Sequence, residues 1–450
     1  MIILGTNSIK DTGYDVDNSL RFNDGSSDDL QKTYSSAETS NKIATVSFWI
    51  KRCLLATEMG ILKGDNSGSD FIRFEPNDQL RIRFSGGSAD IQTNRVFRDV
   101  SAWYHIVVAF DSTQGTSSNR IKVYVNGVQE TSLATSSYPS QNTTFKFSTN
   151  SATNTVGADG SQYYDGYISE FVWIDGQQLA PDQFGEFDED NGIWKPIDVS
   201  GLTFGTNGFY LDFEDSSALG NDVSGNNNDF TVNNLTAIDQ STDTCTNNFA
   251  TLNPLINTNQ TLSDGNTVLD FPQGNDAHMY SNIGFSAGKF YAEFKINSFT
   301  ADRAHSLALY TDITTTGLYL NFCKTGNANV ITSFGSAVQT NLASFSAGDI
   351  IGMAVDADNG TVDFTKNGSA YGSQVTGLSS NFSGKYLFFG FFGEGHGSLT
   401  RVFNASCNFG SPAFAISSGN TDGNGYGNFE YAVPSGYLSL CTKNLSEVLG

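Results

Sequence analysis

Basic residues are scarce in this sequence. Its 450 residues include 24 lysines and arginines against 47 aspartates and glutamates, which gives a formal net charge of −23 and an isoelectric point near 4.3. Proteins that bind nucleic acid need clustered basic side chains to neutralise phosphates, so we expect no nucleic-acid partner. The same shortage argues against docking on anionic lipid through a polybasic patch.

Long apolar runs are also missing. No stretch approaches the roughly 20 apolar residues that a membrane-spanning helix requires. The N-terminal residues contain neither a basic start nor an apolar run long enough for a secretion signal. We therefore expect no membrane insertion.

Cysteine and histidine are few. The five cysteines show no Cys-x-x-Cys spacing, which argues against a zinc ribbon and a dense disulfide framework, and we expect buried thiols. Four histidines argue against a metal centre with several histidine ligands.

Residues typical of helices are sparse, with 4 methionines and few Glu–Lys pairs at helical spacing. Short β-branched and aromatic runs alternate instead with segments rich in Gly, Ser, Asn and Asp, which predicts many strands joined by turns. In residues 120–125, for example, Ile121, Val123 and Val125 share one face. One buried face and one wet face are typical of stacked antiparallel sheets, so we predict an all-β protein built of sandwiches.

The same local design occurs twice. An apolar strand, a turn and a second strand end at Asn126-Gly127 in the first half and at Asn367-Gly368 in the second. Two copies about 240 positions apart, each ending in the Asn-Gly pair of a tight hairpin turn, predict two related sandwiches in tandem.

We predict four segments. Residues 1–215 form the first sandwich and residues 256–415 the second. Residues 216–255 form an ordered connector, and residues 416–450 form a short extension that packs on a domain or on a neighbouring subunit. The apolar residues that pin the connector to a surface are Phe230, Val232, Leu235 and Phe249.

Motifs in the first half resemble those of laminin-G-like domains of the concanavalin A type. They are V-S-F-W-I-K at 46–51, W-Y-H-I-V at 103–107, V-Y-V-N-G at 123–127 and D-G-Y-I-S-E-F at 165–171. Their order covers most of residues 15–215. The resemblance implies an antiparallel jelly-roll sandwich with Phe48, Trp49 and Trp103 in its core.

The second half resembles a SPRY domain, which is also a concanavalin A-like sandwich. The motifs are G-K-F-Y-A-E-F at 288–294, G-D-I-I-G-M-A-V-D at 348–356 and G-T-V-D-F-T-K-N-G at 360–368. The resemblance covers residues 260–412. The tryptophan that usually follows the Gly-Lys pair is absent, and Tyr291 occupies the aromatic position.

The whole sequence is similar to tandem laminin-G and SPRY proteins of marine bacteriophages, including N-N-F-A-T-L-N-P at 247–254 and P-S-G-Y-L-S-L at 434–440. This resemblance implies a virion structural protein: a tail fibre, an appendage or a head decoration. Its partners would be capsid or tail proteins and further copies of itself, for example in a trimer. A host-surface glycan is a candidate ligand, and the implied location is the virion.

The alternative is a carbohydrate-active enzyme or a lectin module, because concanavalin A-like folds host both. A glycosidase needs two carboxylates about 5–10 Å apart, and Asp212 and Glu214 would share one face of a strand. The alternating acidic pattern of retaining glucanases is not reproduced around them, so solvated strand-end acids are the better interpretation. No Gly-x-Ser-x-Gly elbow precedes a suitable Asp and His, and His396 lies in a glycine-rich turn. We expect no enzyme activity and assign no catalytic residue.

Calcium is the one metal that the resemblance leaves open, because laminin-G-like domains often hold a calcium ion at a sandwich edge. No segment matches an EF-hand loop, so we assign no metal ligands and expect no other cofactor. Acidic residues with suitable oxygens are Asp15, Asp17, Asp24, Asp28, Asp29, Asp159 and Asp165.

Loop aromatics are the candidate ligand-binding residues. Tyr138, Tyr163 and Tyr164, with Asp165, lie where rings can stack on sugars. The alternative is that these rings cover the end of the sandwich.

The segment 384–393 contains four phenylalanines. Alternation places Phe388 and Phe392 on one face and Phe389 and Phe391 on the other. Two apolar faces indicate either a central strand covered on both sides, which we favour, or a surface buried against another subunit.

Overall fold

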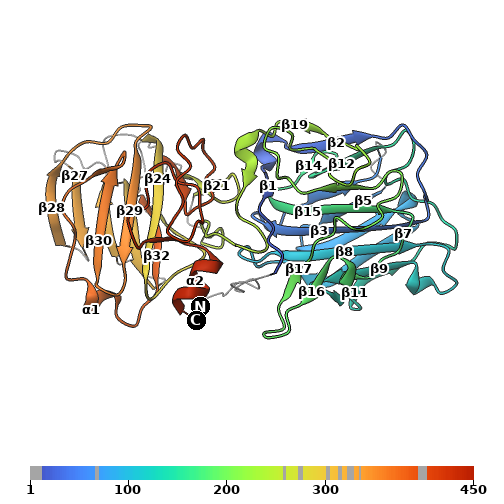
Figure 1. Cartoon of the computed structure of the whole chain (residues 1–450), viewed down its shortest axis with the longest axis horizontal. Coiled ribbons are helices and arrows are strands. Elements are labelled where there is room, and N and C mark those ends of the chain that lie inside the picture. Colours follow the sequence, from blue (N-terminus) through green and yellow to red (C-terminus); the bar gives the residue numbers. More distant parts are fainter. Residues whose placement is uncertain are drawn as a thin grey trace. The chain divides into compact units, whose positions relative to one another are not determined.

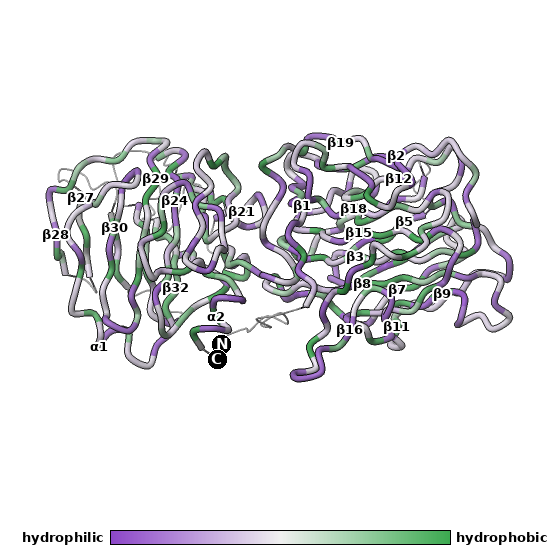
Figure 2. Tube along the Cα trace, viewed as in Figure 1, coloured by the Kyte–Doolittle hydropathy of each residue, from purple (hydrophilic) through white to green (hydrophobic). Residues whose placement is uncertain are grey.

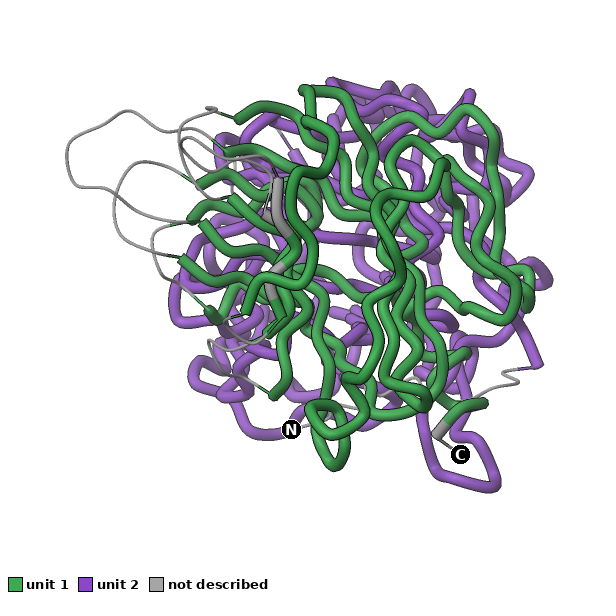
Figure 3. Tube along the Cα trace, turned by 90° about the vertical axis from the view of Figure 1, so that its left-hand side faces the viewer, with its two compact units in different colours: residues 1–4, 248–450 green, residues 5–247 purple. Residues whose placement is uncertain are grey.

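The computed structural model describes residues 13–65, 70–256, 260–271, 277–299, 305–312, 317–321, 329–333, 336–393 and 403–449. These residues form two compact units (Figure 3). We call the described residues up to Asn247 the first domain and those from Asn248 the second domain. Within the described part of the chain, no helix is long and apolar enough to cross a membrane.

Two eight-stranded antiparallel sheets make up the first domain (Figure 1). The first sheet has the order β10-β9-β8-β3-β15-β1-β20, and β18 pairs with β15. Its strands are β10 (Val128–Gln129), β9 (Ile121–Val125), β8 (Tyr104–Asp111), β3 (Ile43–Arg52), β15 (Gly166–Asp175), β1 (Ser19–Phe22), β20 (Gln240–Ser241) and β18 (Phe209–Leu211).

The second sheet of this domain has the order β11-β7-β6-β5-β4-β12-β2-β19. Its strands are β11 (Leu133–Ser137), β7 (Ala89–Val96), β6 (Gln79–Phe84), β5 (Phe71–Phe74), β4 (Met59–Lys63), β12 (Thr153–Val156), β2 (Asp29–Thr33) and β19 (Thr231–Asn233). Two short hairpins add β13 (Ala158–Asp159) with β14 (Gln162–Tyr163), and β16 (Gly185–Phe187) with β17 (Trp194–Pro196).

The core of the first domain follows from the period-two pattern of its strands. Phe48, Phe110 and Trp173 of one sheet share a buried cluster with Ile72 and Ile82 of the other. Figure 2 shows hydrophobic stretches on the strands and hydrophilic loops between many of them. The expected hairpin turn is confirmed, because Asn126 and Gly127 both have positive φ angles, 48° and 76°.

The second domain is also a pair of antiparallel sheets. One has the order β21-β22-β33-β24-β29-β30-β31, with β34 parallel to β24, and the other has the order β23-β32-β25-β26-β27-β28. The strands are β21 (Thr261–Ser263), β22 (Val268–Phe271), β33 (Phe403–Asn408), β24 (Lys289–Phe299), β29 (Ile350–Asp356), β30 (Thr361–Lys366), β31 (Ser369–Ala370), β34 (Leu438–Ser439), β23 (Ala277–Tyr280), β32 (Leu387–Gly393), β25 (His305–Thr311), β26 (Gly317–Asn321), β27 (Asn329–Ser333) and β28 (Ser336–Leu342). The helices are α1 (Ser379–Phe382) and α2 (Thr442–Leu449).

Strand β32 is central in its sheet, between β23 and β25, as favoured from the sequence. Phe389 and Phe391 lie in the main core of the second domain. On the opposite face, Phe388 is 7% exposed and packs against Tyr280 at a ring-centroid distance of 5.8 Å. Both faces of this strand are therefore covered by apolar side chains.

The segment expected to be a connector is divided between the two domains. Phe230 and Leu235 lie in the core of the first domain, and β19 and β20 belong to its two sheets. Strand β20 pairs with β1, so the first and last strands of this domain are neighbours. Phe249 bridges to Cys441 in the second domain. The structure thus divides the chain at 247/248, inside the segment 216–255.

The C-terminal extension packs on the second domain through β34, which pairs with β24, and a buried carboxylate orders the extension itself. Asp422 Oδ2 accepts hydrogen bonds from Ser439 N (2.8 Å), Ser439 Oγ (2.7 Å) and Asn444 Nδ2 (2.7 Å). Its Oδ1 accepts hydrogen bonds from the backbone N–H groups of Asn424 and Tyr426, both at 2.9 Å. One aspartate therefore ties β34 and α2 to the loop before them.

Candidate functional site

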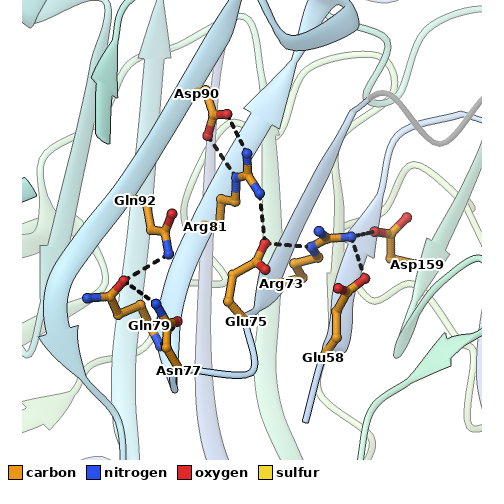
Figure 4. Close-up of polar contacts among 9 residues, drawn as sticks. All are labelled: Glu58, Arg73, Glu75, Asn77, Gln79, Arg81, Asp90, Gln92 and Asp159. Carbon is orange, nitrogen blue, oxygen red and sulfur yellow. Dashed lines mark hydrogen bonds and ion pairs between the residues drawn. The ribbon is translucent and has the colours of Figure 1, made fainter. Parts of the chain in front are cut away.

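A row of charged and amide side chains crosses the outer face of the sheet that contains β4 to β7 (Figure 4). On β5 and β6, Ile72 and Ile82 point into the core, so alternation turns Arg73 and Arg81 outward. We call this set the polar row. Its members are Glu58, Arg73, Glu75, Asn77, Gln79, Arg81, Asp90, Gln92 and Asp159.

Two arginines occupy the centre of the polar row. Arg73 and Arg81 are directly opposite each other on neighbouring strands, a placement that is unfavourable for like charges. Glu75 offsets the repulsion, because its Oε1 accepts from Arg73 Nε at 2.9 Å and from an Arg81 terminal nitrogen at 3.2 Å. The shared carboxylate holds both guanidinium groups in fixed positions.

Further carboxylates pair with the two arginines at the two ends of the polar row. Asp90 on β7 receives two hydrogen bonds from Arg81, at 2.9 and 2.6 Å, in the bidentate geometry that fits a guanidinium to a carboxylate. At the other end, Arg73 contacts Asp159 at 3.1 Å and Glu58 at 2.7 Å. The Asp90 hydrogen bond raises the pKa of Arg81, and burial raises the pKa of Asp159 against the lowering effect of Arg73.

The geometry of the polar row suits the binding of a ligand. Its charged side chains are 6–30% exposed, so they remain within reach of a ligand while their partners fix them. Donors and acceptors alternate at hydrogen-bonding distance along it, and a pair of neighbouring hydroxyl groups can donate to a carboxylate and accept from a guanidinium. Each of its four carboxylates is paired with Arg73 or Arg81: Glu58, Glu75, Asp90 and Asp159.

Gly60 permits the Asp159 end of the polar row to form. It is opposite Arg73 on β4, and a Cβ atom at this position would lie 1.9 Å from the backbone nitrogen of Asp159. Gly60→Ala is expected to push β13 outward, separate Asp159 from Arg73 and cost about 1–3 kcal/mol of stability. Thermal unfolding followed by tryptophan fluorescence measures the loss. Gly115→Ala, at a position with open space, is the control, and an unchanged melting temperature for Gly60→Ala would contradict this account.

A buried acidic cluster lies at a bulge in β15. The register of β15 against β3 shifts between Ser169 and Val172, and Glu170 in the bulge has a φ of 51° and is 6% exposed. Its Oε2 accepts hydrogen bonds from Tyr210 Oη at 2.7 Å and from Tyr14 Oη at 3.4 Å. Burial raises the pKa of Glu170 to about 8, so this carboxyl group is protonated at neutral pH.

The two acids predicted from the sequence lie near this cluster but not on a strand. Strand β18 ends at Leu211, and Phe213 has a φ of 62°, so alternation does not set the separation of Asp212 and Glu214. Glu214 N–H donates to Asp212 Oδ1 at 3.2 Å, as in a turn. Both charges act on Glu170, and burial raises the pKa of Asp212 and of Glu214.

The structure does not gather the loop aromatics into one site. Tyr164 has no exposed surface and its hydroxyl donates to the Lys51 carbonyl oxygen at 2.8 Å, so its ring cannot stack on a ligand. Tyr138 is half-buried against the core beyond β11, whereas Tyr163 is on β14 beside β4. Four strand spacings, about 19 Å, separate β11 from β4. Asp165 is 6% exposed, and its carbonyl oxygen accepts from Cys53 N–H at 3.1 Å.

Three of the acidic residues considered for calcium have protein partners. Asp159 pairs with Arg73, Asp28 accepts from Asn23 N–H and Asp29 accepts from Asn233. Among the residues described, no group of three or more acidic, histidine or cysteine side chains is arranged to hold a metal ion. His396 and Cys323 lie outside those residues, and the other four cysteines are buried as expected.

The polar row was not predicted from the sequence. A sequence pattern that indicates it is present in F-I-R-F at 71–74 and Q-L-R-I-R-F at 79–84. Arginines there alternate with core residues on two successive strands. Charged residues at the wet positions of a strand are common, so the pattern alone does not identify a site.

Comparisons with known proteins gave one family match and several similar solved structures. Residues 24–182, which include the whole polar row, match the family model of the concanavalin A-like lectin/glucanases superfamily. No curated protein matches the sequence. The chain is similar in structure to the SPRY domain of human HERC1, at 14% identity over 35% of this chain and 96% of that chain, with a TM-score of 0.29. It is also similar to a heptameric SAP-like pentraxin from Limulus polyphemus (17% identity, 38% and 81% coverage, TM-score 0.28). A third similar structure is a Bacteroides ovatus protein proposed to bind carbohydrate (15% identity, 49% and 60% coverage, TM-score 0.34).

Proposed function

We propose that this chain is a non-catalytic structural protein of a bacteriophage virion whose first domain binds a carbohydrate through the polar row. The virion role, as a tail fibre, an appendage or a head decoration, rests on the sequence resemblance to tandem laminin-G and SPRY proteins. The carbohydrate-binding role rests on the geometry of the row and on the lectin/glucanase family match over the same residues. Assembly with capsid or tail proteins and into homo-oligomers, for example trimers, is part of the proposal.

The observation that carries the binding role is the pair of hydrogen bonds from the Arg81 guanidinium to the Asp90 carboxylate, next to the shared Glu75 carboxylate. Three planar groups are fixed on rigid strands before a ligand arrives, so little side-chain entropy is lost on binding. Sugar hydroxyl groups both donate and accept, and they suit a surface on which the two functions alternate.

Arg81→Lys is expected to weaken glycan binding at least tenfold. Lysine keeps the positive charge but cannot reproduce the bidentate contact with Asp90 or the fixed plane of the guanidinium group. A glycan array identifies the ligand, and titration of that glycan measures the dissociation constants of the wild type and the variant.

Arg95→Ala is the matched control, because Arg95 forms an ion pair with Glu130 on the same sheet outside the polar row. It should bind as the wild type does. Equal binding by Arg81→Lys and the wild type would remove the polar row from the proposal. Mass spectrometry of purified virions tests the structural role separately, and the absence of this chain from them would refute it.

The second candidate is a carbohydrate-active enzyme, and Glu170 is the observation that favours it. A protonated glutamate beside two further carboxylates is the arrangement of a general acid with its partner. We place it second because Glu170 is 6% exposed and both its contacting hydroxyls come from the protein. Glycan hydrolysis by the wild type that is lost in both Glu170→Gln and Asp212→Asn would replace the binding proposal with this one.

A further inference from the structure

Lys51 and Asp243 form an ion pair that is fully shielded from water. Both side chains have 0% exposed surface, and Lys51 Nζ lies 2.7 Å from Asp243 Oδ2. The pair joins β3 to the segment after β20, across 192 residues of sequence. Removing two charges from water is costly, and mutual attraction repays that cost only in part. The complete burial of this ion pair is therefore not explained by electrostatic attraction alone.

Aromatic side chains and hydrogen bonds hold the two groups in place. Trp103 Nε1 donates to Asp243 Oδ1 at 3.1 Å, which leaves Oδ2 facing the amine. The ring of Tyr167 lies 5.4 Å from Lys51 Nζ. Ser19 Oγ donates to the carbonyl oxygen of Asp243 at 2.6 Å and fixes its backbone. Trp103 and Tyr167 are both 0% exposed.

A second carboxyl group, that of Asp165, lies in the neighbourhood of this pair. Tyr167 is directly opposite Lys51 in the register of β15 and β3, and Asp165 precedes it by two residues. Cys53 N–H donates to the Asp165 carbonyl oxygen at 3.1 Å, which places Asp165 opposite Cys53, two residues from Lys51. The charges of Asp165, Lys51 and Asp243 all act on the Cys53 thiol. Asp165 is 6% exposed, so it too is shielded from solvent.

We propose that Lys51 and Asp243 condense to an intramolecular isopeptide bond. Lys51 Nζ, after passing a proton to Asp165, attacks Cγ of Asp243 and forms the new C–N bond. The bond from Cγ to Oδ2 then breaks, and Oδ2 leaves as water with the proton that Asp165 returns and a second proton from the nitrogen. An ammonium and a carboxylate become one amide and one water molecule, so charge and atoms balance without any oxidant or co-reactant.

Burial favours this reaction in two ways. Two reacting groups held in contact act at a very high effective concentration, and the product replaces two buried charges with a neutral amide. Departure of water from a site without exposed surface also opposes the reverse hydrolysis. The bond would close a covalent loop from β3 to the end of the first domain and keep that domain connected under force or heat, beyond its role in binding.

The intact mass of the purified wild-type chain, measured after denaturation, tests the proposal. We expect a mass about 18 Da below that of the sequence, from the loss of one water, and a proteolytic fragment in which the peptides of Lys51 and Asp243 are joined. Lys51→Met should have the full mass of its own sequence. A wild-type chain with its full sequence mass would overturn the proposal, and this measurement does not depend on whether any variant folds.

Asp165→Asn tests the proton transfer by Asp165 separately from the reaction of Lys51 with Asp243. It keeps Lys51 and Asp243 in place but cannot carry a proton between them. In newly synthesised chains sampled over time, we expect the mass loss to appear at least tenfold more slowly in this variant than in the wild type. Formation of the cross-link at the wild-type rate would remove Asp165 from the reaction.

Discussion

Replacing Glu170 by glutamine is expected to make the first domain far less sensitive to alkaline pH. Burial raises the pKa of Glu170 from 4.5 in the unfolded chain to about 8 in the folded one. Between these values the folded state holds a proton that the unfolded state releases, so stability falls as pH rises. The contribution of Glu170 protonation to the free energy of unfolding is complete below about pH 4.5 and is lost as pH passes through 8. It amounts to about 3–5 kcal/mol.

Tryptophan fluorescence can measure this effect in the first domain alone. All four tryptophans, Trp49, Trp103, Trp173 and Trp194, lie in that domain. Denaturant titrations at pH 5, 7 and 9 should show a steep loss of stability for the wild type and a shallow one for Glu170→Gln, which should be the more stable of the two at pH 9. Glu189→Gln, at an exposed position, is the control. Parallel pH profiles for all three proteins would show that Glu170 is ionised in the fold.

Loss of the Asp422 carboxylate is expected to loosen β34 and α2 from the loop that precedes them in the C-terminal extension. Asp422→Ala removes five hydrogen bonds and takes the acceptor from the buried N–H and hydroxyl groups of Ser439. Each orphaned donor costs about 1–3 kcal/mol in isolation, and because such losses are not additive we expect about 4 kcal/mol in total.

Hydrogen–deuterium exchange reports this loss directly. Peptides from residues 416–449 should exchange much faster in Asp422→Ala, while peptides from β25 and β32 should change little. Asp363→Ala is the matched control, since Asp363 accepts one hydrogen bond from Gln374 at the surface of the same domain. Unchanged protection of α2 in Asp422→Ala would mean that its apolar contacts alone hold the helix.

The strand architecture could be predicted from the sequence because it depends on local patterns. Alternation identified the two faces of β9 and of β32, and the Asn-Gly pairs identified both hairpins, where Asn367 and Gly368 have φ angles of 49° and 76°. These features need only neighbouring residues to be decided. The all-β class and the tandem sandwiches are confirmed for that reason.

The acidic cluster could not be predicted in the same way. Burial raises the pKa of Glu170, and the charges of Asp212 and Glu214 add to this effect. Hydrogen bonds from Tyr210 and from Tyr14, near the other end of the domain, oppose it. Asp212 and Glu214 appeared as a strand pair, but the strand ends one residue before Asp212. Such details depend on tertiary contacts across more than 150 residues, which alternation does not report.

The pairing of β1 with β20 has a consequence for synthesis. Ser19 is opposite Ser241, so the sheet cannot close until the last strand of the first domain leaves the ribosome. At about 5–20 residues per second, the first strand waits roughly 10–45 s for its partner. During that interval the edge of β1 that β20 later covers exposes unpaired backbone groups, which can recruit other nascent chains. High-level production of this chain at low temperature, or together with a holding chaperone, is therefore expected to yield more correctly folded material than rapid production alone.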